Sequence, residues 1–256
     1  TADQAGALDC VSARRRSRPP PAGRRSYAVT GREASMVTVD TDMLAVEESP
    51  GLVTLELARP AKLNALTPPM VRGLASAFEQ LEDDAGRAVL LAGQGRAMCA
   101  GMDEDIVSDD YATEHAGLHE TLEGVYRQVE AHPGPVALAG HGAVIGAALL
   151  VSLSCEFVVV GEGATLAIPE VSYGIASDRA ASALPGDVGR RVASELVLTG
   201  EPLDPERARA VGLVNDVVAG DADAVRERAR ELLGAVTRHD GEVVAEVIRG
   251  MSGDRS

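Results

Sequence analysis

Two short stretches of small residues, far apart in the chain, most constrain how it can fold. They are Gly95–Asp103 and Gly142–Ala148. Each has the pattern of a buried strand that ends, turns through small residues and leads into a helix. Backbone N–H groups in such turns point toward open space. Two turns of this kind can together form an oxyanion hole, a pair of donors for a developing negative charge.

Strands and helices are predicted to alternate along the chain. Strands are predicted over 52–57, 88–92, 135–139, 157–160 and 165–168, where apolar residues alternate or form short runs. Helices are predicted from Thr67-Pro68, over about 146–154, from Asp204-Pro205 and over 221–236. Alternation of this kind favours an α/β fold.

The composition suits one sizeable core without membrane contact. The chain has 256 residues, of which 45% are hydrophobic, but aromatic residues make up only 2% and tryptophan is absent. Alanine, valine and leucine must therefore fill the core. No apolar run is long enough to span a bilayer, and the start of the sequence lacks the apolar stretch of a secretory signal, so we expect a cytoplasmic protein. Cys10, Cys99 and Cys155 have neither metal-ligand nor disulfide spacing.

Charge divides the chain into two parts. Residues 1–35 hold seven of the 24 basic residues and three of the 39 acidic ones, including the run Arg14-Arg15-Arg16. We predict a disordered basic extension there, with nucleic-acid binding as the alternative. The remaining chain is strongly acidic and has one lysine, Lys62. Such a surface disfavours nucleic acid and anionic membranes as partners; a halophilic source or a GC-rich coding bias would explain it.

Further motifs extend the pattern of the two turns. Ala58–Thr67 lies upstream and Pro169-Glu170 lies downstream. Together the four segments resemble the crotonase superfamily, also called the enoyl-CoA hydratase/isomerase family, over about residues 44 to 236. The resemblance implies a crotonase-type spiral of repeated ββα units over 36–200. It also implies a C-terminal helical oligomerisation region over 201–256 that forms a homotrimer or a dimer of trimers. The family's tail usually carries more helix than we expect after Thr237.

The resemblance implies an acyl-CoA thioester as substrate, with coenzyme A as part of that substrate and no separate cofactor. Enolate chemistry on a thioester needs two donors on the carbonyl oxygen and a carboxylate beside the α-carbon. By the family's pattern, the donors are the N–H groups of Met102 and Ala147. Substrate-binding residues by the same pattern are Lys62, Ala100, Gly101, Asp103 and Gly146. The alternative for the glycines is tight packing alone, and for Lys62 a solvated loop.

The acidic residues decide which reaction is expected. Hydratases of the family use two glutamates twenty positions apart, and here those positions hold Leu150 and Glu170. A leucine cannot bind water, so we predict double-bond isomerisation with Glu170 as the catalytic acid/base. Asp178, eight residues later, resembles an aspartate of dienoyl-CoA isomerases and is predicted as a second catalytic acid. The alternatives are an ion pair with an arginine for Glu170 and a helix N-cap for Asp178.

Other reactions and classes stay open. Hydration with a single glutamate, hydrolysis of a 3-hydroxyacyl-CoA thioester by Glu170 and Asp178, and a non-catalytic relative that binds acyl-CoA are the alternatives. His115 and His119 have a spacing that could hold a metal, but no third ligand is evident, and no metal site is predicted. The sequence has no Gly-x-Ser-x-Gly elbow and no phosphate-binding loop signature.

Overall fold

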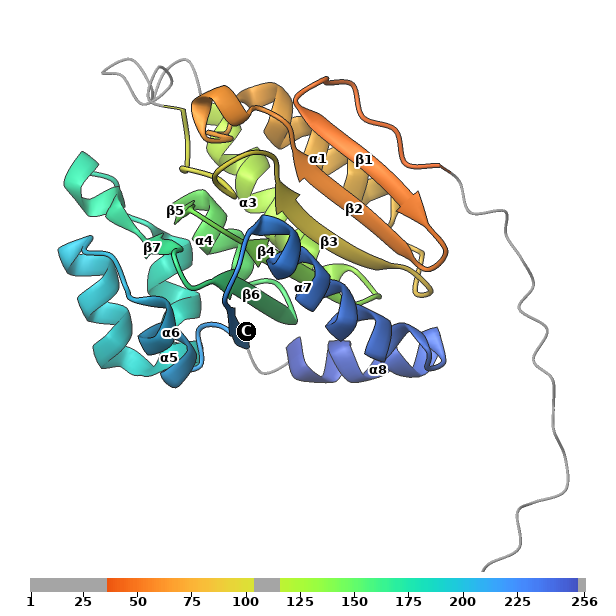
Figure 1. Cartoon of the computed structure of the whole chain (residues 1–256). Helices are drawn as coiled ribbons and strands as arrows, with labels where there is room; N and C mark the ends of the chain where they lie inside the picture. Colours follow the sequence, from red (N-terminus) through yellow and green to blue (C-terminus); the bar gives the residue numbers. More distant parts are fainter. Residues whose placement is uncertain (1–35, 104–115, 253–256) are drawn as a thin grey trace, which may run out of the picture. The chain divides into compact units, whose positions relative to one another are not determined.

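The computed structural model describes residues 36–103 and 116–252, so the extension predicted over 1–35 lies outside the described residues. Its main sheet has the order β1-β2-β3-β4-β6-β8 (Figure 1). These strands are β1 (Leu44–Ser49), β2 (Leu52–Leu57), β3 (Ala88–Gly93), β4 (Val136–Gly140), β6 (Phe157–Gly161) and β8 (Asp216–Val218). β1 is antiparallel to β2, and the other pairs are parallel. A second, parallel sheet pairs β5 (Ala143–Ile145) with β7 (Thr165–Ala167).

Helices cover both faces of the main sheet (Figure 1). α1 (Pro68–Gln80) and α3 (Ala116–Ala131) pack on one face, and α7 (Ala222–Thr237) crosses the other. Successive side chains of a strand point to opposite faces. Along β3, Val89 and Leu91 accordingly belong to the core under α1 and α3, whereas Ala88 and Leu90 pack under α7. The central strands β3 and β4 are therefore buried on both sides, as is typical of parallel sheets.

Where the sequence has a clear period or a clear start signal, the predicted strands and helices are confirmed. β2 matches the predicted strand, and α1 begins at Pro68 directly after Thr67. α6 (Pro205–Ala210) begins after Asp204, whose carboxylate accepts a hydrogen bond from the N–H of Arg207. α5 (Asp178–Thr199) was not predicted. It contains Pro185 and is kinked at Gly189, and these two breakers hide its helical period.

After Thr237, where we expected less helix than the family's tail usually carries, the structure has α8 (Gly241–Ser252). Its Ala245 and Ile248 are buried, whereas its Val243, Val247 and Met251 are exposed. In the described ranges, every helix is too short or too polar to cross a membrane. The C-terminal part is continuous with the core, since β8 extends the main sheet and α7 covers its face.

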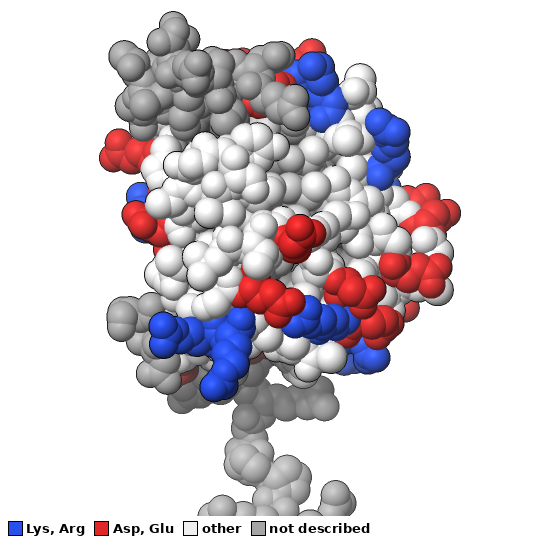
Figure 2. Space-filling view, turned by 90° about the vertical axis from the view of Figure 1, so that its left-hand side faces the viewer, with Lys and Arg blue, Asp and Glu red and all other residues white. Residues whose placement is uncertain are grey.

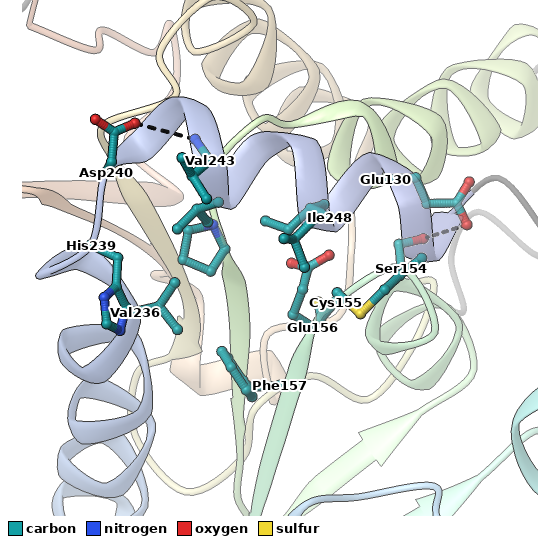
Figure 3. A pocket seen from close by; sticks show the side chains of 14 residues that line it. Glu130, Ser154, Cys155, Glu156, Phe157, Val236, His239, Asp240, Val243 and Ile248 are labelled. Atoms are coloured by element: carbon teal, nitrogen blue, oxygen red, sulfur yellow. Dashed lines mark hydrogen bonds between the residues drawn. The ribbon is translucent and has the colours of Figure 1, made fainter. Parts of the chain in front are cut away.

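A cavity of about 830 Å³ lies beneath α8 (Figure 3). Its lining includes Pro135, which precedes β4, and Phe157, which begins β6, together with the inner side of α8. It therefore lies at the amino ends of the strands. The two predicted turns follow the carboxyl ends of β3 and β4, at the opposite edge of the sheet. This cavity therefore lies at the opposite edge of the sheet from the residues that the sequence predicts as the active site.

Asn64 ties the loop after β2 to the turn after β3. Its side chain is fully buried and its backbone is left-handed, with φ 54°. The amide oxygen accepts from the N–H of Arg59 at 2.8 Å, and the amide nitrogen donates to the carbonyls of Gln94 and Ala97 at 2.9 and 2.8 Å. The two donated hydrogen bonds need an amide, because a carboxylate has no proton to donate at neutral pH.

We therefore expect Asn64→Asp to lower the free energy of unfolding by about 2–4 kcal/mol, since it leaves two buried carbonyls without a donor. Asn215→Asp is the matched control, because Asn215 is exposed and its side-chain oxygen only needs to accept from the N–H of Val158. Chemical denaturation of both variants measures the difference. Equal stability of the two variants would contradict this account of Asn64.

Candidate active site

The two predicted turns lie side by side. The N–H of Cys99 donates to the carbonyl of Ala143 at 2.9 Å, and the N–H of Ile145 donates to the carbonyl of Cys99 at 3.1 Å. Met98 is bonded in the same way to His141, at 2.7 Å. The segment after β3 and the segment after β4 are thus joined like neighbouring strands. This pairing fixes the separation of the two N–H groups that the sequence predicts as oxyanion donors.

Two glycines allow the turns to approach. Gly101 and Gly146 have φ values of 96° and 56°, which side-chain-bearing residues rarely adopt. A Cβ atom at Gly101 would lie 3.3 Å from the carbonyl oxygen of Ile145. A Cβ atom at Gly146 would lie 2.8 Å from Oε1 of Glu170 and 3.8 Å from Cα of Gly101. Gly146 is therefore the point where both turns and the predicted acid/base meet.

The predicted donors lie directly after these glycines. Met102 follows Gly101, and Ala147 is the first residue of α4 (Ala147–Ser152). In the part of the chain that the structure describes, neither N–H donates a hydrogen bond. Ala147 is nearly buried and Met102 is half-buried. Unpaired N–H groups in such surroundings bind an anionic oxygen well, since a buried donor without a partner is costly.

The predicted substrate-binding residues lie along one border of the site. The carbonyl of Leu63 accepts from the N–H of Ala100 at 3.0 Å, which brings the Lys62 loop against the first turn. Lys62 itself is exposed. Asp103 is buried, and its carboxylate is paired with the guanidinium of Arg59. Asp103 therefore orders the turn, and the sequence analysis did not single out its partner Arg59.

Glu170 lies on η2 (Pro169–Tyr173), outside the main sheet. It is half-buried, its Oε2 atom is buried without a hydrogen-bond partner, and within the described ranges it forms no ion pair. The alternative of an arginine partner is thus not supported. Burial raises the pKa of the Glu170 carboxyl above its usual 4.5. Leu150, one turn into α4, is buried and contributes no polar group.

Asp178 is exposed in the first turn of α5, where its charge complements the helix dipole. The N-cap is Ser177, whose hydroxyl accepts from the N–H of Ala180 at 3.2 Å, so the N-cap alternative for Asp178 is wrong. The neighbouring Arg179 is half-buried. It donates to Glu130 at 2.5 Å and to Ser154 at 2.6 Å.

A small apolar cavity of about 30 Å³ adjoins the second turn. It extends between α1, α3 and α4 and is lined by Cys99, Leu122, Val125, Ala147 and Val151, among others. Burial raises the pKa of the Cys99 thiol to about 12, so this thiol stays protonated and is a poor nucleophile. The lining of this cavity is almost entirely apolar, and its volume is about that of one water molecule.

The side of the protein that carries β7, η2 and α5 is shown in Figure 2. A broad uncharged area lies there, with both acidic and basic side chains at its borders. η2 exposes Val171 and Tyr173, and the end of α5 exposes Leu198. Among the described residues, no group of histidine, cysteine and acidic side chains could hold a metal ion. His115 lies outside the described residues, and His119 is exposed on α3.

The chain belongs to the enoyl-CoA hydratase/isomerase family, whose profile matches residues 47–252. A relative from Mycobacterium tuberculosis, named probable enoyl-CoA hydratase echA6, is 31% identical over 204 residues, covering 79% of this chain and 82% of the relative. The 4-chlorobenzoyl coenzyme A dehalogenase-2 of an Arthrobacter species is 33% identical over 219 residues, covering 82% and 79%.

Solved structures give the same assignment. The crystal structure of a putative enoyl-CoA hydratase from Streptomyces coelicolor superposes with a TM-score of 0.78 at 30% identity, covering 89% of this chain and 84% of that one. The predicted crotonase-type α/β fold is therefore confirmed. The names of the relatives include more than one reaction, so membership of the family leaves the reaction of this chain open.

The raised pKa of Glu170 predicts a stability effect. As pH rises above 4.5, the Glu170 carboxyl group loses its proton in the unfolded chain before it does so in the folded protein. The free energy of unfolding therefore falls with pH until the pH passes the higher pKa of the folded state. At neutral pH the ionised, half-buried carboxylate is therefore destabilising. We expect Glu170→Gln to raise the melting temperature at pH 7.5 and to have no effect at pH 4. Thermal denaturation at both pH values measures this, and a lower melting temperature at pH 7.5 would contradict it.

Proposed function

We propose that this protein acts on acyl-CoA thioesters through an enolate stabilised by the N–H groups of Met102 and Ala147, and that its reaction is double-bond isomerisation. The observation that carries this proposal is the position of the Glu170 carboxyl group against Gly146, at the junction of the two turns. The position on α4 where hydratases of the family carry their other glutamate holds the buried, apolar Leu150. One carboxyl group suffices to move a proton between two carbons, whereas efficient hydration also needs a water to be held and activated.

The proposed steps conserve all atoms. The thioester oxygen of a 3-enoyl-CoA accepts hydrogen bonds from Met102 and Ala147, which lowers the pKa of the α-carbon proton. The Glu170 carboxylate removes that proton and forms a dienolate. The resulting carboxylic acid then returns the proton to the γ-carbon, and the double bond moves into conjugation with the carbonyl. The raised pKa of Glu170 suits this exchange, because it brings the pKa of the base closer to working pH.

The surroundings of the turns support an acyl-CoA substrate. The apolar side chains of α3 and α4 beside Ala147 would face the first carbons of an acyl group, although the cavity of about 30 Å³ between them is too small for an acyl chain as it stands. The exposed Lys62, at the outer border of the site, would meet the phosphates of coenzyme A. Since the chain has a net charge of −15, its overall field repels such a ligand, and binding must depend on local donors. No separate cofactor is part of the proposal.

Hydration with Glu170 alone is the second candidate, favoured by the relatives that are named as hydratases. Asp178 is retained in the proposal as a possible second acid for the isomerisation, or with Glu170 for thioester hydrolysis, although it is exposed in this structure. By analogy with the family, we also propose a homotrimer or a dimer of trimers in the cytoplasm. Exposed apolar side chains on α8, η2 and α5 are compatible with such an assembly.

The test is incubation of 2-enoyl, 3-enoyl, 3,5-dienoyl and 3-hydroxyacyl CoA esters with the protein in heavy water, followed by mass spectrometry. Isomerisation leaves the acyl formula unchanged, adds deuterium and moves the double bond. Gain of water would establish hydration, and free coenzyme A would establish hydrolysis. Binding without exchange or product would establish a non-catalytic relative.

Glu170→Gln is expected to lower turnover by about 10²–10⁴-fold, because it removes the group that accepts the proton. Its affinity for a saturated acyl-CoA should change little, since the oxyanion donors belong to the backbone of other segments. Steady-state kinetics and calorimetric titration measure the two effects. Unchanged turnover in this variant would refute the proposed mechanism, and so would a parallel loss of turnover and affinity.

A further inference from the structure

His141 is the first residue after β4, and it is buried, with 8% of its surface exposed. Its imidazole Nε2 atom lies 3.0 Å from the carbonyl oxygen of Gly95, in the turn after β3. A carbonyl oxygen can only accept a hydrogen bond, so Nε2 carries the proton and donates it. The Nδ1 atom is buried and, within the described ranges, has no hydrogen-bond partner. The bond to Gly95 therefore decides both the tautomer and the orientation of the ring.

The main chain of His141 holds the same turn at a second point. Its carbonyl accepts from the N–H of Met98 at 2.7 Å. Gly95 and Arg96 form the exposed tip of this turn, so packing against the core contributes little to their position. Hydrogen bonds must hold the tip instead. His141 supplies them from one side, and the Asn64 amide supplies them from the other.

These two bonds stand at the start of the pairing between the oxyanion turns. After His141 and Met98, the pairing continues through Cys99, which is hydrogen bonded to Ala143 and Ile145. The pairing is short, and several residues of both segments are alanine or glycine, so side-chain packing fixes its register less firmly than in a long strand pair. A slip by one residue would shift one segment by about 3.3 Å along the other and turn its groups to the opposite face.

The relation between the two proposed oxyanion donors depends on this register. Met102 is also held by the loop after β2, because Leu66 is hydrogen bonded to the residues on either side of it, at 2.8 and 3.0 Å. That loop does not carry the second donor, whereas the segment after β4 leads directly into Ala147. Among the described residues, the His141 imidazole is the side chain that hydrogen bonds across the pairing of the two turns. The other bonds of the pairing join main-chain atoms.

We propose that His141 is a positioning residue for the oxyanion hole: its imidazole donates to the Gly95 carbonyl and thereby fixes the register in which the N–H groups of Met102 and Ala147 face the substrate. The side chain acts through the main chain of the first turn and does not itself contact the reacting atoms. The inference rests on the proposed function in taking these two N–H groups as the donors to the thioester oxygen.

The chain offers a matched control in His132, which is 2% exposed and whose Nε2 atom lies 2.9 Å from the carbonyl oxygen of Arg87. This bond lies at the amino ends of β3 and β4, at the opposite edge of the sheet from the turns. His141→Leu and His132→Leu therefore each remove one hydrogen bond from a buried imidazole to a distant carbonyl. His141→Gln is the conservative variant, because its amide nitrogen can occupy the position of Nε2. If His141→Leu does not fold, His141→Asn replaces it, since its amide is one bond too short to reach Gly95.

The first readout is amide hydrogen exchange in the free protein, followed by NMR. We expect His141→Leu to speed exchange of the Met98 and Cys99 N–H groups by about fivefold to tenfold, the effect of losing one ordinary hydrogen bond. His141→Gln and His132→Leu should leave these two rates unchanged. Unchanged exchange in His141→Leu, or equally fast exchange in His132→Leu, would overturn the inference.

The second readout is turnover of the CoA ester that the protein converts. In His141→Leu we expect kcat to fall about 10–100-fold with KM nearly unchanged, because a misplaced donor weakens binding of the transition state more than binding of the substrate. His141→Gln should restore most of kcat, and His132→Leu should keep it. An unchanged kcat in His141→Leu, or an equal loss in His132→Leu, would overturn the inference. Faster exchange in His141→Leu, in a protein that converts no CoA ester, would uphold the role of His141 in the pairing of the turns and refute the proposed function.

Discussion

The contact between two backbone turns governs this structure. The segments after β3 and β4 are hydrogen bonded to each other, and glycines at 101 and 146 leave no side chain between them. Every other feature of the candidate site depends on that approach. It sets the direction of the two free N–H groups, it fixes where Glu170 can lie, and it places the apolar cavity directly behind the turns. A side chain at either glycine would separate these parts.

The polar groups of the site lie in surroundings that are unfavourable for them, because they are buried without hydrogen-bond partners. Oε2 of Glu170 and the N–H groups of Met102 and Ala147 are wholly or partly removed from water and have no hydrogen-bond partner among the described residues. Each such group lowers the stability of the fold, and the surrounding parallel sheet, buried on both faces, compensates for it. The ion pair between Arg59 and Asp103 and the hydrogen bonds of the Asn64 amide hold the loop after β2 against the turn after β3.

The sequence predicted those parts of the fold that have a regular period and a clear start signal. β2, α1 and α6 begin or end within a residue of their predicted positions, and the order of motifs identified the family. α5 was missed because Pro185 and Gly189 interrupt its helical period, and no helix was predicted at the position of α8. For the site, local motifs were enough to single out the two turns and Glu170. Arg59 was not singled out, since an ion pair between distant segments leaves no local pattern in the sequence.

The proposed oxyanion donors belong to the main chain of the core, whereas the proposed proton carrier is one side chain on a five-residue 3₁₀ helix outside the main sheet. Evolution can therefore alter the two parts independently. Replacing or relocating an acid on η2 or α4 changes which atoms react but leaves the strand pairing and both glycines untouched. A lineage built on this scaffold can explore new reactions without first losing its ability to fold, and the hydratases and the dehalogenase among the relatives are consistent with that history.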